Sequence, residues 1–361
     1  MRVLSEGFRL EFLVDYGTFL AKSVTVVAAL LVVVSGMVAI ASKPKRGAHG
    51  FLEVTKLNDK FQEMKEMLEY HVMDKHSLKA RHKSEKKEEK ARDKAMAKKV
   101  KAGELPEARK KHLYVLDFNG DIRASAVDSL RQAISGLLQV ADADNDEVVV
   151  KLESGGGMVH SYGLASAQLQ RIKDHGLKLT VCVDKVAASG GYMMACVADK
   201  IVASPFAVLG SIGVVAQIPN VHRLLKKNDI DVEVLTAGEF KRTLTVFGEN
   251  TDKGRQKFIK DLEDTHVLFK EFVNEHRPVV DIEKVATGDV WFGRRALDVK
   301  LVDELVTSDA YLMQACKEAT VYEIKFVERK SIPEKLGLAA SVGVEGAIER
   351  AWGRLTARHS L

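Results

Sequence analysis

From residue 112 onward, the chain alternates short apolar runs with amphipathic stretches. Runs rich in β-branched residues and closed by turn residues such as Asn119-Gly120 are typical of strands, whereas apolar residues three or four positions apart are typical of helices. Strands are predicted over residues 113–118, 147–152, 177–183, 201–203 and 231–235, and helices over 125–140 and 158–175. This succession favours a largely parallel sheet, with any active site in the loops at the carboxyl ends of its strands.

The N-terminal region has a different pattern. Residues 23–42 form an uncharged, largely apolar run of twenty residues, which is long enough to cross a bilayer as a helix. The run is longer than the core of a typical signal peptide, although Ala39-Ile40-Ala41 has the form of a cleavage site. It also lacks the polar face of a helix in a soluble domain. We predict a transmembrane helix, with a cleaved signal peptide and a buried helix as alternatives.

Residues 51–103 are predicted to form a helical, solvated connector. Its first part carries an apolar stripe through Phe61, Met64, Leu68 and Val72, whereas residues 83–101 contain nine Lys or Arg and four Asp or Glu. A partly disordered linker and contact with anionic lipid head groups are the alternatives. Nucleic acid is disfavoured as a partner because no aromatic residues alternate with the basic ones.

Composition narrows the class of protein. Apolar residues make up 46% and charged residues 29% of the 361 residues, which excludes a disordered chain, a fibre and a polytopic membrane protein. The net charge of +5 gives no reason to expect a dedicated nucleic-acid binder. Three cysteines are too few for a disulfide framework. We expect no metal and no cofactor.

Three loops at predicted strand ends contain candidate chemistry, namely residues 153–158, 187–192 and 237–241. Ser189, among small Ala and Gly neighbours, fits a nucleophile at a strand-to-helix turn, or alternatively a helix cap. The three glycines 155–157 fit a phosphate loop, a tight turn or an oxyanion donor. They lack the Lys-Ser/Thr ending of a nucleotide P-loop.

A serine nucleophile needs a base. His160 is close in sequence to the glycines, but no carboxylate is obviously placed to orient it. Lys241 is the better candidate, since it follows a glycine turn beside Phe240. A lysine acts as a base near neutral pH only where burial removes water from it, and an exposed lysine is the ordinary alternative.

Taken together, four motifs resemble the signal peptide peptidase family of serine–lysine peptidases over residues 112–306. In order, they are Glu153-Ser-Gly-Gly-Gly-Met158, Ala187-Ala-Ser-Gly-Gly-Tyr192, Leu209-Gly-Ser-Ile-Gly-Val214 and Gly238-Glu-Phe-Lys241. The membrane helix and charged connector fit the layout of one membrane-anchored type within that family. Two departures are Gly155, where the family usually has proline, and Lys300, where it usually has glycine.

The resemblance implies a role for each matching residue. Ser189 matches the nucleophile, Lys241 the general base, and Ser211 the serine that orients the lysine, while Gly156 and the N–H of Gly190 match the oxyanion hole. It also implies an α/β fold of repeated βαβ units like that of the Clp protease and crotonase group. Assembly into a ring or dome of identical subunits is implied as well, with the substrate grooves facing inside.

These observations divide the chain into an N-terminal segment (1–22), a transmembrane helix (23–42), a charged connector (43–111), a serine peptidase domain (112–306) and a C-terminal extension (307–361). We expect a single-pass protein of the bacterial inner membrane that cleaves signal peptides or other membrane-associated peptides. The resemblance places the catalytic domain in the periplasm, whereas the Lys and Arg count beside the span leans towards the cytoplasm.

Two competing functions fit the same loops. A crotonase-like acyl-CoA enzyme uses glycine oxyanion donors without a Ser–Lys dyad, and a non-catalytic membrane scaffold keeps only the fold. The combination of Ser189, Ser211 and Lys241 argues against the acyl-CoA enzyme, and full activity of a Lys241→Ala protein in vivo would indicate the scaffold.

Overall fold

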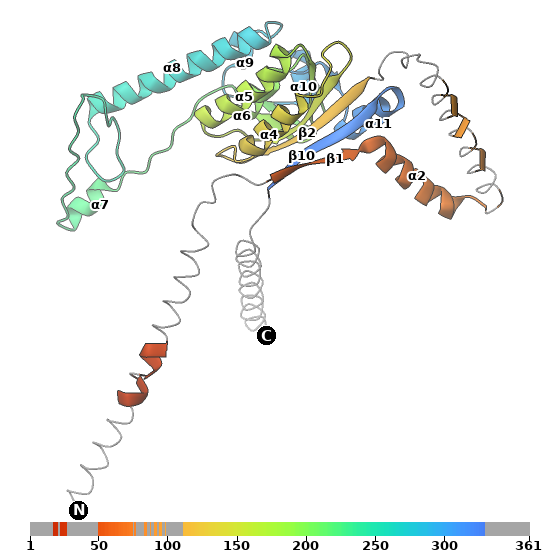
Figure 1. The fold of residues 1–361 in the computed structure, drawn as a ribbon. Coiled ribbons are helices and arrows are strands. Elements are labelled where there is room, and N and C mark those ends of the chain that lie inside the picture. Colours follow the sequence, from red (N-terminus) through yellow and green to blue (C-terminus); the bar gives the residue numbers. More distant parts are fainter. Residues whose placement is uncertain are drawn as a thin grey trace, which may run out of the picture. The chain divides into compact units, whose positions relative to one another are not determined.

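The computed structural model describes residues 17–20, 22–26, 50–74, scattered positions between 76 and 98, and 111–328 (Figure 1). The chain divides into two units, Met1–Phe51 with Glu328–Leu361, and Leu52–Val327. Beyond Ser23–Val26, the predicted membrane helix lies outside the described residues, as does the predicted C-terminal extension beyond Glu328. Within the described parts, no helix combines the length and the apolar character that crossing a membrane requires.

The larger unit is an α/β body. Its strands are β1 (Gly50–Lys56), β2 (His112–Gly120), β3 (Glu147–Ser154), β4 (Lys178–Val183), β5 (Val186–Ala188), β6 (Lys200–Ala203), β7 (Val208–Gly210), β8 (Val290–Phe292), β9 (Glu304–Leu305) and β10 (Thr320–Glu328). Its helices are α2 (Leu57–Val72), α4 (Val127–Leu137), α5 (Val159–Asp174), α6 (Gly190–Ala195), α7 (His222–Lys227), α8 (Asp252–His276), α9 (Ile282–Val285), α10 (Gly293–Asp298) and α11 (Ser308–Glu318).

The strands form one sheet that forks near its middle. The main path runs β1-β10-β2-β3-β4-β6-β9, and the register from β10 to β9 is parallel throughout. At the end of β3, Ser154 pairs instead with Ala187, so β5 and then β7 branch off, and β8 adds to β7 in the antiparallel direction. The mixed α/β class and the mostly parallel sheet are therefore confirmed.

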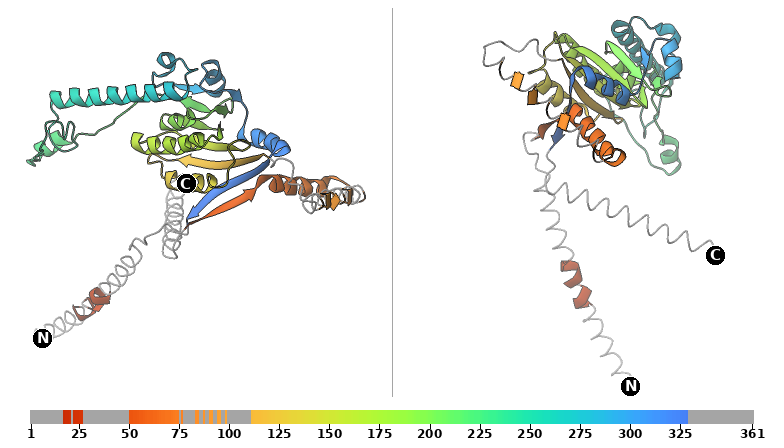
Figure 2. Two further views of the ribbon diagram at one scale, coloured as in Figure 1. Left: turned by 45° about the horizontal axis from the view of Figure 1, so that its top comes forward. Right: turned by 90° about the vertical axis from the view of Figure 1, so that its right-hand side faces the viewer.

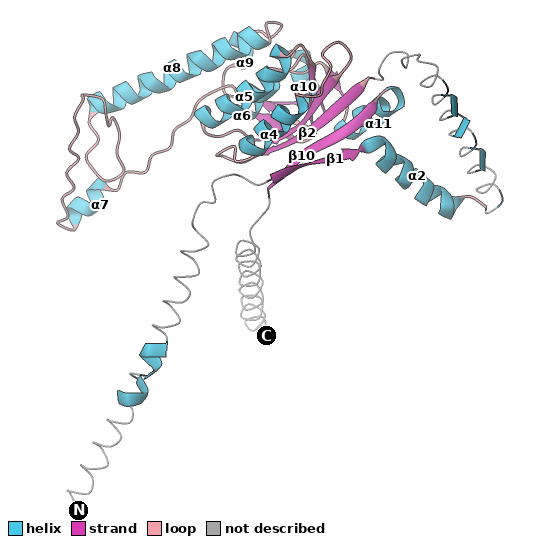
Figure 3. Ribbon diagram, in the orientation of Figure 1, coloured by secondary structure: helices cyan, strands magenta, loops and turns pink. Residues whose placement is uncertain are grey.

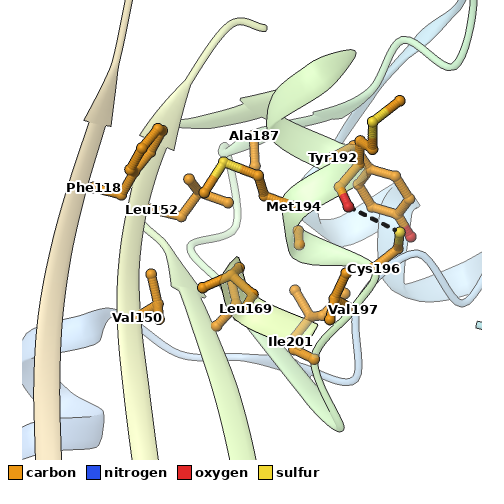
Figure 4. Packing of buried hydrophobic residues seen from close by; sticks show 14 of the residues in the cluster. Phe118, Val150, Leu152, Leu169, Ala187, Tyr192, Met194, Cys196, Val197 and Ile201 are labelled. Atoms are coloured by element: carbon orange, nitrogen blue, oxygen red, sulfur yellow. Dashed lines mark hydrogen bonds between the residues drawn. The ribbon is translucent and has the colours of Figure 1, made fainter. Parts of the chain in front are cut away.

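Alternation along the strands explains why helices cover both faces of the sheet (Figure 3). In β2, Tyr114, Leu116 and Phe118 pack into the larger core with α4, α5 and α6, whereas Leu113 and Val115 pack into a second core with α2 and α11. In the larger core, Met194 of α6 reaches towards Leu152 and Ala187 (Figure 4). The short helix after Ser189 is thus buried on all sides.

Two predicted elements are wrong. Residues 231–235 form no strand, because they are exposed and no described strand pairs with them, so their β-branched residues have no sheet to join. The predicted connector helix does not begin at residue 51, because Gly50–Lys56 is strand β1, which pairs with β10, and helix α2 starts only at Leu57. The remaining strands predicted between residues 113 and 203, and both helices, are confirmed with small shifts at their ends.

One segment projects from the body. Helix α8 is 25 residues long, yet only Phe269 and Val273 near its C-terminal end are buried. Beyond its N-terminal end lie α7 and the loops around it, away from the sheet in every view (Figures 1 and 2). We call residues 215–250 the arm. Every residue from Asp231 to Arg242 within it is exposed, including Leu235 at 87%.

Candidate active site

Ser189 occupies a strained turn between β5 and α6. Its backbone has φ 51° and ψ −120°, a conformation that costs a non-glycine residue about 1–3 kcal/mol and persists only where the surroundings hold it. Two backbone bonds hold it here, since its N–H donates to the Gly210 carbonyl at 2.8 Å and its carbonyl accepts from the Met193 N–H at 2.9 Å. The turn leaves Ser189 half-buried at the end of the forked sheet, where the sequence predicts an active site.

Small residues around Ser189 are required by packing. A Cβ on Gly190 would lie 2.4 Å from Cγ of Tyr162, and one on Gly191 would lie 2.4 Å from the Ser154 carbonyl oxygen. Neither position therefore has room for a side chain. The Ala-Ala-Ser-Gly-Gly sequence thus brings the backbone of the Ser189 turn directly against the end of β3.

Ser211 is brought close to Ser189 by the branch strands. It follows Gly210, the residue whose carbonyl binds the Ser189 N–H, and it also has a positive φ of 51°. Its own N–H donates to the Asp289 carbonyl at 2.7 Å, which fixes the loop after β7 against the loop before β8. The predicted nucleophile and the serine predicted to orient the lysine therefore lie on adjoining backbone segments.

The glycine loop, residues Gly155–Gly157, packs against the same turn. Gly156 has φ 86°, and a Cβ there would lie 2.7 Å from the Gly190 nitrogen and 2.8 Å from Cβ of Ser189. The Gly156 N–H donates to Ser154 Oγ at 3.1 Å, so in this conformation it does not face a substrate. The oxyanion role predicted for Gly156 therefore does not match the direction of its N–H. In the described part of the chain, the next amide, that of Gly157, has no acceptor.

A cavity of about 200 Å³ opens beside Ser189. Gly157, Gly190 and Met193 line it on the sheet side, and α8 closes it with Leu268, Phe269 and Phe272. Its wall is therefore mainly apolar and suits an aliphatic side chain. Sequence reasoning did not find the α8 residues, although an apolar repeat over residues 265–273 was the available signal.

Neither of the two candidate bases bonds Ser189 among the described residues. Lys241 is exposed on the arm, and no hydrogen bond or ion pair among the described residues joins it to Ser189 or Ser211. Its N–H donates to the Gly238 carbonyl at 3.2 Å, which shapes the predicted glycine turn. His160 is exposed in the first turn of α5, likewise with no bond to Ser189 in the described residues.

Two free cysteines, Cys182 and Cys196, are buried. Burial raises the pKa of Cys182 and of Cys196 to about 12, which leaves both thiols protonated and unreactive. Across the described ranges, no three His, Cys, Asp or Glu side chains are grouped to hold a metal ion.

A strained serine at the carboxyl end of a parallel sheet, beside backbone amides and an apolar cavity, defines the class as an α/β serine hydrolase.

Comparison with known proteins identifies the family. Peptidase family S49 N-terminal matches residues 11–169, and peptidase family S49 matches residues 171–322. The chain is 52% identical over 341 residues to the probable protease SohB of Haemophilus influenzae, covering 94% of this chain and 96% of that protein. It is 47% identical over 305 residues to the probable protease SohB of Buchnera aphidicola subsp. Schlechtendalia chinensis, covering 84% and 99%.

A solved structure, a mutant of the 1510-N membrane-bound stomatin-specific protease in complex with a substrate peptide, matches with a TM-score of 0.39 and 14% identity, covering 63% of this chain and 97% of its own. The two S49 matches and the relatives at 47–52% identity show that the chain belongs to peptidase family S49, the signal peptide peptidase family of serine peptidases. Within that family, its relatives over most of its length are proteases of the SohB type. The resemblance drawn from the motifs is confirmed. Of the three functions considered from the sequence, family membership supports the peptidase rather than the scaffold or the acyl-CoA enzyme.

Proposed function

We propose that this chain is a membrane-anchored serine endopeptidase in which Ser189 is the nucleophile and Lys241 the general base. The observation that supports it most is the Ser189 turn. Ser189 is held at φ 51° between an apolar cavity and a glycine loop. Strain of this kind is retained where it orients a reacting group.

The chemistry follows from this arrangement. Ser189 Oγ attacks the carbonyl carbon of the substrate's peptide bond while the neutral amine of Lys241 takes its proton. The backbone N–H groups of Gly190 and Gly157 bind the resulting oxyanion, each donor contributing about 3–4 kcal/mol of transition-state stabilisation. The lysine ammonium then protonates the leaving amine, and water hydrolyses the acyl-enzyme by the reverse sequence. Ser211 orients the lysine.

Lys241 reaches Ser189, in this proposal, from a neighbouring copy of the chain. The exposed arm with Lys241 lies away from the body, and apolar side chains such as Leu235, Phe240 and Phe247 are uncovered on it. Exposed apolar residues on a projecting segment are typical of a surface that a partner covers. Enclosure in the neighbour's groove removes water from the amine and favours its neutral form.

The cavity indicates the class of substrate. Its mainly apolar lining, with α8 on one side and glycines on the other, accepts an aliphatic side chain next to the bond that is cut. With the apolar run at residues 23–42 anchoring the enzyme, peptides released from or lying in the membrane are the natural substrates. We therefore propose signal peptides and similar apolar segments.

Two substitutions test the nucleophile and the base. Ser189→Ala and Lys241→Ala should each lower kcat on a fluorogenic apolar peptide by about a thousandfold or more, since members of one catalytic unit fail together. A fluorophosphonate probe should label wild type at Ser189 only. Lys253→Ala, which changes another exposed lysine close to Phe240, is the matched control and should keep its activity. Labelling or turnover that persists in Ser189→Ala contradicts the proposal.

We also propose that the catalytic domain lies on the periplasmic side of a bacterial inner membrane, with residues 23–42 as the single span. Alkaline phosphatase fused to the C-terminus should then be active. An inactive alkaline phosphatase fusion, together with a fluorescent cytoplasmic reporter at the same position, would place the domain in the cytoplasm. The domain boundaries predicted from the sequence stay a prediction, although β10 joins the sheet from beyond residue 306.

A further inference from the structure

Two buried hydroxyl groups lie beneath the glycine loop. Ser154, the last residue of β3, is 2% exposed, and Tyr162 of α5 is fully buried. Their oxygen atoms are 2.5 Å apart, and Tyr162 Oη donates to the Asp121 carbonyl at 2.7 Å. The Ser154 hydroxyl has two acceptors in reach, the Gly120 carbonyl at the 3.5 Å limit and Tyr162 Oη at 2.5 Å. Because the single Tyr162 proton is used on Asp121, the short contact requires the Ser154 hydroxyl to donate to Tyr162. Burial raises the pKa of Tyr162, so its hydroxyl stays protonated and available to donate.

The direction of these hydrogen bonds determines whether Ser154 presents its proton or its lone pairs to the glycine loop. With its proton directed at Tyr162, Ser154 Oγ presents its lone pairs, and the Gly156 N–H donates to them at 3.1 Å. A chain of hydrogen bonds, which we call the hydroxyl chain, therefore runs from Gly156 through Ser154 and Tyr162 to Asp121. Since one bond holds the Gly156 N–H, it restricts the rotation of a peptide segment in which three consecutive glycines have no side chains to restrain them.

Tyr162 also contacts the other side of the site. Its ring lies directly against Gly190, where a Cβ would be 2.4 Å from its Cγ. Gly156 in turn packs on the Gly190 nitrogen and on Cβ of Ser189. One side chain thus supports both backbone segments whose amides the proposed mechanism uses.

We propose that Ser154 and Tyr162 are positioning residues for the hydrolysis: through Gly156, their hydroxyl chain holds the glycine loop so that the Gly157 amide faces the oxyanion formed at Ser189. Neither side chain touches the substrate. The inference rests on the proposed function, and it adds the groups that orient one of its oxyanion donors. A purely structural role would stabilise the fold without any preference for the transition state.

A positioning role and a purely structural role predict different kinetics. Loss of the hydroxyl chain frees the Gly156–Gly157 peptide. A freely rotating amide binds the charged transition state less well, whereas binding of the uncharged substrate carbonyl is unchanged. Tyr162→Phe and Ser154→Ala in the full-length protein should therefore each lower kcat about 10- to 100-fold, below the loss for a missing donor, with KM nearly unchanged. The double variant should be no slower than the slower single variant, because both substitutions interrupt the same chain.

Tyr192→Phe is the matched control. Tyr192 is also fully buried, follows Ser189 in α6, and donates its hydroxyl to a backbone carbonyl, that of Leu301, at 3.0 Å. It makes no hydrogen bond to the glycine loop among the described residues. Tyr192→Phe should therefore lower the melting temperature about as much as Tyr162→Phe does, while kcat stays close to that of wild type.

The experiment measures kcat and KM on a fluorogenic peptide, the rate of fluorophosphonate labelling at Ser189, and the melting temperature for all five proteins. Equal kcat for Tyr162→Phe and Tyr192→Phe overturns the inference, as does a loss that appears only in KM. Should Tyr162→Phe fail to fold, Ser154→Ala decides the question alone. A wild type that neither cleaves the peptide nor labels at Ser189 overturns the proposed function itself, which is a different outcome.

Discussion

At the scale of single residues, three consecutive glycines have three different surroundings. Gly155 faces open space, with no atom within 4 Å of the point where a Cβ would lie, whereas Gly156 has a positive φ of 86° and contacts the Ser189 turn. A Cβ on Gly157 would lie 2.1 Å from the Ile122 carbonyl oxygen. Only the second and third glycines are therefore required by the structure, and a Cβ at position 155, where the family usually has proline, meets no neighbouring atom.

This difference predicts opposite outcomes for two alanine substitutions. Gly155→Ala should keep activity and raise the free energy of unfolding by up to about 0.5 kcal/mol, because alanine restricts the unfolded chain. Gly156→Ala should lower that free energy by about 1–3 kcal/mol and abolish peptidase activity, since it forces the loop away from Ser189. Chemical denaturation and a peptide assay measure both. An active Gly156→Ala protein would show that the glycine loop does not support catalysis.

Much of the site could be located from motifs at this scale. Ser189, Ser211 and the glycines 155–157 appear in the sequence as separate motifs, and the structure places them on adjoining backbone segments. The direction of the Gly156 N–H could not be foreseen, because it depends on a hydroxyl of Tyr162 from a different element. The α8 wall of the cavity could not be foreseen either, since helix packing joins residues distant in sequence.

At the scale of elements, one buried carboxylate joins three of them and the residue before a fourth. Glu147 at the start of β3 accepts hydrogen bonds from Thr180 of β4 at 2.9 Å, from Tyr311 of α11 at 2.8 Å, and from Lys111 before β2 at 2.8 Å. Burial opposes its charged form, but the three hydrogen bonds outweigh burial and hold its pKa below the usual value. The carboxylate is therefore charged in the folded protein.

The pH dependence of stability follows from this lowered pKa. Glu147 contributes stability that is complete above its unfolded pKa and is lost as pH falls through its folded pKa. Glu147→Gln should cost about 1–3 kcal/mol at pH 7, because an amide nitrogen replaces the oxygen that accepts from the Lys111 ammonium, and should flatten the loss of stability on acidification. Urea denaturation between pH 7 and pH 3 measures both effects. Glu318→Gln, an exposed carboxylate of α11, is the control. Equal acid sensitivity in wild type and Glu147→Gln would contradict this role.

Elements were predictable where burial and pattern agree. The strands at 113–118, 147–152 and 177–183 are buried on two faces, so their apolar runs leave no alternative to a central parallel strand. The run at 231–235 has similar residues but lies on the exposed arm without a partner strand. Strand pairing is a tertiary property, and a short apolar run carries no information about whether a partner exists.

At the scale of the whole molecule, the arm explains why Lys241 makes no bond to the Ser189 of its own chain. If Lys241 serves the Ser189 of a neighbour, two inactive variants can complement each other. Equal amounts of Ser189→Ala and Lys241→Ala, unfolded together and reassembled, should regain about a quarter of wild-type activity, the fraction of random neighbour pairs with both intact groups. Each variant treated alone should stay inactive. A mixture as inactive as its components would show that the dyad forms within one chain.

By itself, the sequence determined the α/β class, the parallel central strands, the motif order and the candidate residues for the chemistry. These depend on local pattern and on residue types that few other roles require. Only the tertiary structure decided that β1 and β10 complete the sheet, that Tyr162 and Ser154 lie beneath the glycine loop, and that Lys241 is exposed on a projecting arm. Each is a contact, or the absence of one, between residues far apart along the chain, and such pairings are set by packing of the whole body.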